Sequence, residues 1–591
     1  MKRLALLLLL PAVSFAQDEE TWTLDEANQV LESTYGILLQ PDLDELSDAE
    51  RLALSELLVA GKLMHELYLQ QRHPDSFDAL QRLGSGELAG TELGAKLRDL
   101  FYLSKGPYAT TLDNRRLPLL PGIAAETPGR TVYPDAVSRE NLESWLASHP
   151  GKRADILDVR SVVRRANEDN LTSDLEQLDA FPEVAALNPG LRESLQDLVD
   201  DDTAKDGFYA VPYALAYAPT LRKVREALNT AAANLATDSP DFAAYLRNRA
   251  RDLLSSDYEA GDAAWVRGRF DNLNLQLGSY ETYDDALFGV KAFFGASVLV
   301  RDRVKSKALN EAIRDLQSIE DALPYSGSKT VSSDIPVGVY NVVADFGQAR
   351  GANTATILPN DADHARKYGR TILIRNNLLT HPGLFTLRKQ RFDAVMSDAV
   401  KNDLTVDGGF ERTLWHEVGH YLGAAETADG RSLDVALSDT ASLFEELKAD
   451  LVSLFAAPAL RESGYYDNAE QRAHYADGIR RTLQDVKPRP TQPYRNMQLM
   501  QFNFFMEAGL IELDFESGAL AINYERYHDI VSDMLEQVLL IQYEGDYEAA
   551  RAFIQRWNYW EDILHGRLAR QIKEGSPTQR TLVRYGILDE G

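Results

Sequence analysis

Five consecutive residues carry the strongest chemical signal in the chain: His416-Glu417-Val418-Gly419-His420. Two imidazoles four positions apart lie on the same face of a helix, one turn from each other. That spacing lets both bind one Zn²⁺ ion at about 2.0–2.1 Å. Glu417 falls beside them, where its carboxylate reaches a water molecule on the metal rather than the metal itself. The pattern predicts a catalytic zinc site; the alternative is a polar helix face without a metal.

A catalytic zinc ion takes three protein ligands and keeps one position open. The segment LFEELKADLVSLF, residues 443–455, has an apolar stripe at helical spacing and a polar side with three carboxylates. One of them, Glu446, lies 26 positions after His420, which leaves room for a loop and a second helix packed on the first. We predict Glu446 as the third ligand. Asp450 and Glu445 are the expected supporting carboxylates, which accept the free ring N–H groups of the ligand histidines.

The elements that must position these residues are mostly helices. The sequence indicates helices from Thr21 to about Leu103 and over residues 141–260, and short β-branched strands over about 330–376. We therefore expect an α+β fold, mostly α, with two lobes. Residues 17–391 would form a mainly helical region with a β-containing lobe, built on a small β-barrel or β-sheet. Residues 392–591 would form the helical zinc-binding lobe, with the active-site cleft between the lobes.

Composition and the first residues bear on location and partners. Lys2 and Arg3 precede a short apolar run that ends in Ser14-Phe15-Ala16, which predicts a signal peptide cleaved after Ala16 and an exported, periplasmic or secreted, protein. The chain has 591 residues, no cysteine and a net charge of −29. Cysteine nucleophiles and disulfides are therefore excluded. So acidic a protein is not expected to bind nucleic acid or anionic membranes.

Several stretches resemble the dipeptidyl peptidase III family of zinc peptidases, in its shorter bacterial form with a five-residue HExxH motif. They are HEVGHYLG (416–423), EELKAD (445–450), YLRNRARDLLSSDYEAGDAAW (245–265), LGSYETYDDALFGVKAFF (277–294) and MQFNFFMEAGLI (500–511). The resemblance runs in patches from about residue 50 to 560. It implies a two-lobed fold with zinc in the cleft and the release of dipeptides from the free amino end of short peptides.

By motif position, the resemblance implies further site residues. Asn360, in LPND, matches a residue that helps to hold the peptide, and Glu281 is a second candidate for substrate binding. The family has a histidine ahead of the stretch matching MQFNFFMEAG, and that histidine helps to stabilise the transition state. Its place is taken here by Tyr494, whose phenol can also donate a hydrogen bond to a developing oxyanion. Packing at the start of a helix is the alternative role for Tyr494.

The sequence thus predicts a zinc metallopeptidase with one Zn²⁺ per chain and peptides as its substrates. A water molecule at the open metal position would be activated by Glu417. Two other functions stay open: a thermolysin-like zinc endopeptidase, and a catalytically silent zinc-containing peptide-binding protein. The sequence does not indicate an oligomeric state.

Overall fold

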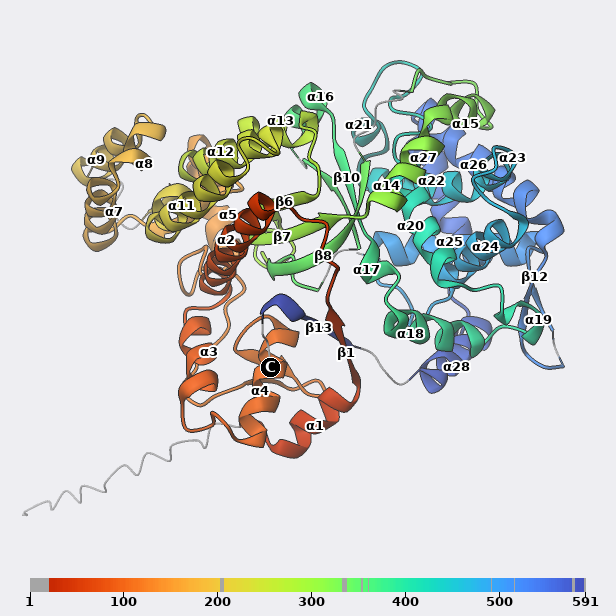
Figure 1. Ribbon diagram of the computed structural model, residues 1–591, viewed down its shortest axis with the longest axis horizontal. Coiled ribbons are helices and arrows are strands. Elements are labelled where there is room, and N and C mark those ends of the chain that lie inside the picture. The colour runs from red at the N-terminus through yellow and green to blue at the C-terminus, as the bar shows by residue number, and fades with distance from the viewer. Residues whose placement is uncertain are drawn as a thin grey trace, which may run out of the picture.

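The computed structural model describes residues 21–201, 207–331, 337–351, 354–359, 361–490, 492–514, 516–576 and 580–588. The predicted signal peptide, residues 1–16, lies outside them. Two lobes flank a central sheet, with the earlier part of the chain on one side and the later helices on the other (Figure 1). The predicted class, mostly helical and two-lobed with a small β-structure, is confirmed. No helix of the described residues is long and apolar enough to cross a membrane.

The central sheet has five strands in the order β6-β7-β8-β10-β9. Their bounds are β6 Leu273–Glu281, β7 Phe293–Arg301, β8 Val337–Gly347, β9 Ala355–Leu358 and β10 Thr371–Arg375. Only the β8–β10 pair is parallel; the other three pairs are antiparallel. Strands β8, β9 and β10 lie where the sequence indicates strands. The first two strands lie outside that region, although Leu273, Leu275 and Leu277 alternate with polar residues in the way a strand requires.

The first lobe packs helices against one face of this sheet. Its long helix α2 (Asp48–Arg72) begins with a capping box of Ser47 and Glu50 and packs on β7, β8 and α11. The other helices of this part of the chain are α1 Leu24–Glu32, α3 Ser76–Ser85, α4 Glu92–Ser104, α5 Arg139–Ser148, α6 Arg153–Ile156, α7 Glu168–Ala180, α8 Pro182–Leu187, α9 Leu191–Asp200, α10 Tyr213–Ala216, α11 Ala218–Asn234, α12 Pro240–Ser255 and α13 Glu259–Arg267.

The second lobe is a bundle around helix α20 (Val406–Gly419), which carries His416 and Glu417 and is capped at its end by His420. Two helices pack on α20, namely α22 Ala441–Phe455 and α24 Asn468–Thr482. Two more pack on α22, namely α25 Pro493–Ala508 and α26 Tyr527–Glu544. The remaining helices are α14 Arg303–Ala312, α15 Leu316–Ala322, α16 Ala362–Tyr368, α17 Asn376–Leu379, α18 Pro382–Asp393, α19 Asp398–Lys401, α21 Leu433–Leu437, α23 Ala457–Glu462, α27 Tyr547–Trp557 and α28 Arg567–Gly575. Of these, α16 packs on α13 of the first lobe.

Strand β10 joins the two hydrophobic cores. Ile372 and Ile374 belong to the core of the second lobe, whereas Leu373 between them belongs to the core of the first. Successive side chains of a strand point to opposite faces, so the sheet has one core on each side here. Helices α14 and α15, which precede residue 392, also pack in the second core. The domain boundary expected at residue 391 stays a prediction.

The two ends of the described chain meet in the first lobe. Strand β1 (Thr34–Leu39) pairs in parallel with β13 (Arg580–Tyr585), close to β8 (Figure 1). Tyr585 is fully buried and its hydroxyl donates a hydrogen bond of 3.1 Å to Asp345 of β8. The last strand therefore leaves the helical bundle and returns to the lobe in which the chain began. Three further two-stranded pairs complete the structure: β2 Tyr108–Thr110 with β3 Arg116–Pro118, β4 Ser161–Arg165 with β5 Phe208–Pro212, and β11 Ile511–Leu513 with β12 Leu520–Ile522.

Candidate metal centre and active site

Helices α20 and α22 approach each other closely at the HExxH residues. A Cβ atom on Gly419 would lie 2.5 Å from the backbone oxygen of Ala449, which is closer than side-chain atoms approach in proteins. Glycine at this position therefore lets the two backbones touch, and the polar side of α22 lies directly against the two histidines. Packing of α24 and α26 on the same pair fixes their positions further.

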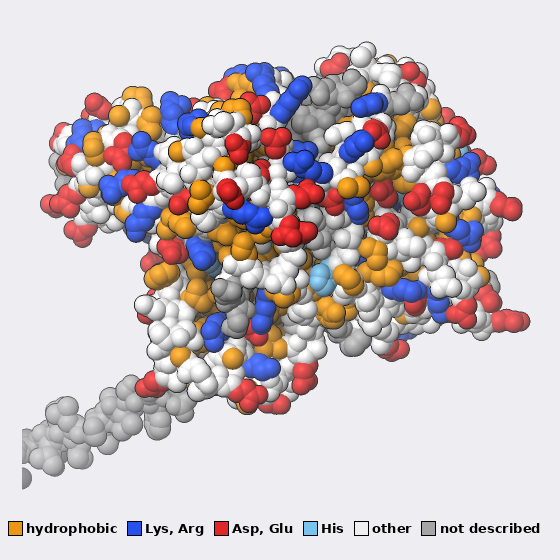
Figure 2. Space-filling view, in the orientation of Figure 1, with side chains coloured by type: hydrophobic (Ala, Val, Ile, Leu, Met, Phe, Trp, Pro, Cys, Tyr) orange, Lys and Arg blue, Asp and Glu red, His pale blue; other side chains and the backbone are white. Residues whose placement is uncertain are grey.

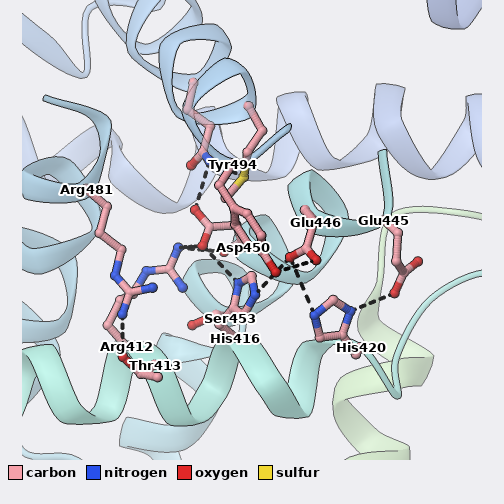
Figure 3. Close-up of polar contacts among 12 residues, drawn as sticks. Arg412, Thr413, His416, His420, Glu445, Glu446, Asp450, Ser453, Arg481 and Tyr494 are labelled. Atoms are coloured by element: carbon pink, nitrogen blue, oxygen red, sulfur yellow. Dashed lines mark hydrogen bonds and ion pairs between the residues drawn. The ribbon is translucent and has the colours of Figure 1, made fainter. Parts of the chain in front are cut away.

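Three atoms converge between these helices. The Oε2 atom of Glu446 lies 3.2 Å from Nε2 of His416 and 3.7 Å from Nε2 of His420 (Figure 3). Of the described residues, none donates a hydrogen bond to this buried oxygen. The sequence prediction placed these three residues in one site, and the structure brings them together.

Asp450 holds the first imidazole. His416 is buried, and its Nδ1 lies 3.0 Å from Oδ1 of Asp450, so the ring donates there and turns Nε2 toward Glu446. The same carboxylate receives Arg412 at 2.7 Å and the side-chain amide of Gln501 at 2.8 Å. Three donors on one buried carboxylate leave the His416 ring little freedom to rotate.

Glu445 holds the second imidazole. Its Oε1 atom lies 2.8 Å from Nδ1 of His420 and 2.9 Å from the ammonium of Lys448. Lys448 is buried and also donates to the backbone oxygens of Gly419 and Leu422, at 3.0 and 2.8 Å. The lysine therefore satisfies backbone oxygens at the end of α20, where a positive charge is favourable. It also connects that helix end to the Glu445 carboxylate, which binds His420.

The arrangement fits a zinc ion. Two imidazole nitrogens and one carboxylate oxygen are the donor set of many catalytic zinc sites. Ligands at about 2.0–2.1 Å in a tetrahedron stand roughly 3.3 Å apart. The separations of Glu446 from the two imidazoles, 3.2 and 3.7 Å, are close to that. A second group of possible ligands, Asp257, Glu259 and His364, lies near the surface, but its Glu259 is bound to Lys367 at 2.7 Å.

The charges around the metal-binding histidines shift the pKa values of His416 and of the two supporting carboxylates strongly. Burial opposes protonation of His416, but the hydrogen bond to Asp450 and the Glu446 carboxylate outweigh it and raise the pKa of His416 to about 9. Burial likewise raises the pKa of Glu445, yet Lys448 and His420 hold it at about 2. Burial of Asp450 is outweighed by Arg412 and His416, which keep its pKa well below the usual range. Both supporting carboxylates are therefore charged at neutral pH.

The site opens into a large cleft between the lobes, with a volume of about 1430 Å³. One face of α20 lines it at helical spacing, with Gly409, Thr413, His416, Glu417 and His420. The side chain of Glu417 forms no hydrogen bond or ion pair with any described residue, so its carboxylate is available to a molecule in the cleft.

Tyr494 projects into this cleft from the first turn of α25. It is 53% exposed, and its hydroxyl donates a 2.7 Å hydrogen bond to Oε1 of Glu446. Partial burial of the ring and the Glu446 carboxylate raise the pKa of Tyr494 well above its usual value, so the phenol stays a donor. The tyrosine that takes the place of the family histidine thus lies beside the candidate metal ligands.

The structure places one of the two predicted substrate-binding residues, Glu281, in the cleft. Glu281, at the end of β6, and the exposed Tyr283 line the large cleft and also a smaller pocket of about 230 Å³. The nearby Asp285 is buried and accepts hydrogen bonds from four backbone N–H groups and from Tyr133. Asn360 lies outside the described residues.

Two arginines of α24, Arg480 and Arg481, line the cleft, with side chains 21% and 19% exposed. Both bind Asp477, which is buried in α24. His474, the histidine nearest in sequence to the missing family histidine, is fully buried and lies 3.1 Å from the backbone oxygen of Ser453.

Sequence reasoning missed three residues that support the site. Arg412 stands four positions before His416, and Lys448 lies within the EELKAD stretch, so both lie one helical turn from residues already singled out. That spacing was a usable signal. Gln501 had no such signal, because it reaches Asp450 from α25, 51 residues away in sequence.

No protein-family model matches the chain. Solved structures are similar to it along nearly its whole length. DPP III from Caldithrix abyssi is 24% identical with a TM-score of 0.79, and the match covers 95% of this chain and 99% of that one. Dipeptidyl-peptidase III from Corallococcus sp. strain EGB is 23% identical with a TM-score of 0.72, covering 96% and 98%. The chain therefore has the dipeptidyl peptidase III fold, which confirms the resemblance seen in the sequence at the level of the fold.

One curated protein is also similar. Nudix hydrolase 3 of Arabidopsis thaliana is 25% identical over 555 residues, which are 88% of this chain and 69% of the plant protein. About a third of the plant protein lies outside the match, so its name carries no argument about the chemistry of this cleft.

Proposed function

We propose that the chain is a zinc-dependent peptidase that releases dipeptides from the amino terminus of short peptides. The observation that carries the proposal is the buried Oε2 atom of Glu446, which faces two imidazole nitrogens without a hydrogen-bond donor, at the wall of a large cleft. The fold, shared with dipeptidyl peptidase III structures, supports a peptidase.

In this proposal His416, His420 and Glu446 hold the zinc ion. When bound, zinc would lower the pKa of a water ligand toward about 7 and polarise the scissile carbonyl. Glu417 takes a proton from the water while the oxygen of that water attacks the carbonyl carbon. The same carboxylate then gives that proton to the leaving nitrogen as the C–N bond breaks. Tyr494 turns its hydroxyl from Glu446 to the oxygen that becomes negative in the transition state.

Release from the amino terminus requires a group that holds the free ammonium of the substrate. Glu281 is our candidate, because it lines both the large cleft and the adjoining 230 Å³ pocket. A carboxylate there would form a charge-assisted hydrogen bond with the substrate ammonium and fix the distance from it to the scissile bond. An endopeptidase would not need such a contact.

The test is digestion of a mixed peptide library, with the cleavage positions determined by mass spectrometry. We expect dipeptides from free amino ends, no cleavage when the amino end is acetylated, and loss of cleavage in Glu417→Gln. Equal cleavage of blocked and free peptides would identify an endopeptidase instead. A zinc-containing parent that cuts no peptide would favour the silent binding protein.

We also propose that the protein is exported and that cleavage after Ala16 removes the signal peptide. The basic residues and short apolar run at positions 2–13 support this proposal. Sequencing of the amino terminus of the protein from cell fractions tests it; an intact Met1 on the cytoplasmic protein alone would contradict it.

A further inference from the structure

One stretch of the cleft wall is strongly basic, in a protein whose net charge is −29. We call it the arginine wall, and it consists of Arg388, Arg391, Arg480, Arg481 and Arg495. These residues come from three elements: α18, α24 and the first turn of α25. Figure 2 shows Asp and Glu as well as Lys and Arg side chains over both lobes on the face in view, whereas the wall gathers five guanidinium groups in one place.

The arginine wall carries more positive charge than its own carboxylates balance. Asp477 binds Arg480 at 2.5 Å and Arg481 at 3.1 Å, and Asp485 binds Arg495 at 2.8 Å. Two carboxylates thus face five guanidinium groups, an excess of three positive charges. The nearby Asp450 does not reduce this excess, because it is already matched by Arg412.

Two members of the wall have no partner of opposite charge in contact. Arg388 donates to the backbone oxygen of Leu379 at 2.8 Å, and neither it nor Arg391 forms an ion pair with a described residue. Keeping an unpaired guanidinium half-buried among other cations is unfavourable unless an anion joins it. The wall therefore has the composition of a binding site for a negatively charged group.

The wall begins within one helical turn of the proposed catalytic residues. Arg481 donates to the hydroxyl of Thr413 at 2.5 Å, and Thr413 lies four residues before Glu417 on the cleft face of α20. Figure 3 shows Arg481 and Thr413 on one side of the His416–Glu446 group and Glu445 on the other. Four residues of helix span about 6 Å, which an extended peptide covers with roughly two residues.

We propose that the arginine wall binds a carboxylate of the peptide substrate, one to three residues beyond the scissile bond on its carboxyl-terminal side. The proposal rests on the proposed function, and it names the substrate class: short peptides with a terminal carboxylate, or peptides with Asp or Glu at these positions. The amino-terminal side is excluded because the wall repels the substrate ammonium, for which Glu281 is the candidate partner. Guanidinium groups bind carboxylates through two parallel hydrogen bonds, which sets the register of the peptide.

The experiment compares three tetrapeptides. The first has neutral side chains, Gln at the third position and a free carboxyl end. The second is its carboxyl-terminal amide, and the third is that amide with Glu in place of Gln. We expect the parent to cleave the free acid with a kcat/KM roughly 10- to 100-fold higher than the neutral amide, the effect of a charge-assisted contact. Recovery of the rate by the Glu-containing amide identifies a side-chain carboxylate as the ligand. A rate that stays low identifies the terminal carboxylate.

Arg388→Gln is the decisive variant, because it removes a charge without breaking an ion pair. It should reduce the preference for the acid to near unity, and Arg388→Lys should retain part of it. Arg370→Gln is the matched control: Arg370 also lines the cleft but lies outside the wall, and its loss should leave the preference unchanged. An equal fall in both variants would assign the effect to the overall charge of the cleft and overturn the proposal.

A binding measurement separates this inference from the proposed function. Calorimetry of the same peptides with full-length Glu417→Gln protein reports acid and amide affinities without turnover. Tighter binding of the acid, lost in the double variant with Arg388→Gln, supports the wall even if no peptide is cleaved by the parent. Equal binding and equal cleavage of acid and amide would overturn the wall while leaving the peptidase proposal intact.

Discussion

At the scale of single residues, the two oxygens of the Glu446 carboxylate have different neighbours. Its Oε2 atom faces the two imidazoles, and its Oε1 atom accepts the Tyr494 hydroxyl. The group that would hold the metal therefore also positions the proposed donor to the transition state. Substitutions in this pair separate metal binding from catalysis.

The first prediction concerns metal content. His416→Ala and Glu446→Ala each remove one of three ligands, so zinc bound after dialysis should fall from about one ion per chain to a small fraction. Elemental analysis of the purified variants measures this. Glu417→Gln is the matched control and should keep its zinc; undiminished zinc in either alanine variant would show that the ligands are assigned wrongly.

The second prediction concerns pH. Because the pKa of His416 is raised to about 9 in the metal-free protein, zinc must displace a proton from it at neutral pH. Zinc affinity should therefore rise about tenfold per pH unit between roughly pH 7 and 9. Without metal, the protonated ring stabilises the fold below the unfolded pKa of about 6.5, and that stability is lost as the pH rises through 9. Calorimetric titration in buffers of different ionisation enthalpy counts the proton released; no release would contradict the prediction.

The third prediction concerns Tyr494. Tyr494→Phe removes one oxygen from a half-exposed ring, so folding and zinc content should be unchanged. Loss of one donor to the developing oxyanion should lower kcat by about 10²–10³ with little change in KM. Steady-state kinetics on a good peptide substrate measures both constants. If kcat stays at the parent value, Tyr494 only packs against Glu446.

At the scale of elements, the crossing of α20 and α22 shows what the sequence could and could not reveal. The spacing of His416 and His420 predicted a helix and its metal-binding face, because periodicity is local. The position of Glu446 on a second helix was predicted from the apolar stripe of residues 443–455. Gln501 could not be predicted, because its contact with Asp450 depends on how α25 packs. The same limit applies to Arg480, whose placement in the cleft wall is decided by tertiary packing around Asp477.

The fourth prediction tests that crossing. Gly419→Ala places a Cβ atom 2.5 Å from the backbone oxygen of Ala449, so the helices must separate. We expect a loss of about 1–3 kcal/mol in the free energy of unfolding and weaker zinc binding. Gly409→Ala on the same helix is the control. Its Cβ would meet Asp477 Oδ1 at 3.4 Å, an ordinary contact, and alanine favours helix by about 1 kcal/mol. Denaturant unfolding that shows equal stability for both variants would contradict the close approach.

At the scale of the whole molecule, one sheet connects the two lobes and one pair of strands joins the two ends of the chain. The alternate side chains of β10 enter different cores, so the lobes share a strand rather than a linker. The pair β1–β13 closes the first lobe with residues that follow the whole helical bundle. Stability of the first lobe therefore depends on the last residues of the second half of the chain.

The fifth prediction tests this dependence. Tyr585→Ala empties a fully buried site next to Asp345 and should cost about 3–5 kcal/mol, with the largest loss in the first lobe. Leu38→Ala is the control on the partner strand, where a 52% exposed side chain contributes much less. Hydrogen exchange measured along the chain should show α2 and β1 losing protection in Tyr585→Ala; protection equal to that of the control would refute the role of β13.

The pairing of β1 with β13 also sets the order of events during synthesis. Strand β1 ends at Leu39, and its partner β13 begins 541 residues later, at Arg580 (580 − 39). Until β13 has been synthesised, the nascent chain carries a strand without its neighbour, an open edge to which other chains can add. The first lobe is completed only after the helical bundle has been synthesised, so a part of the protein that is made early is among the last to finish folding.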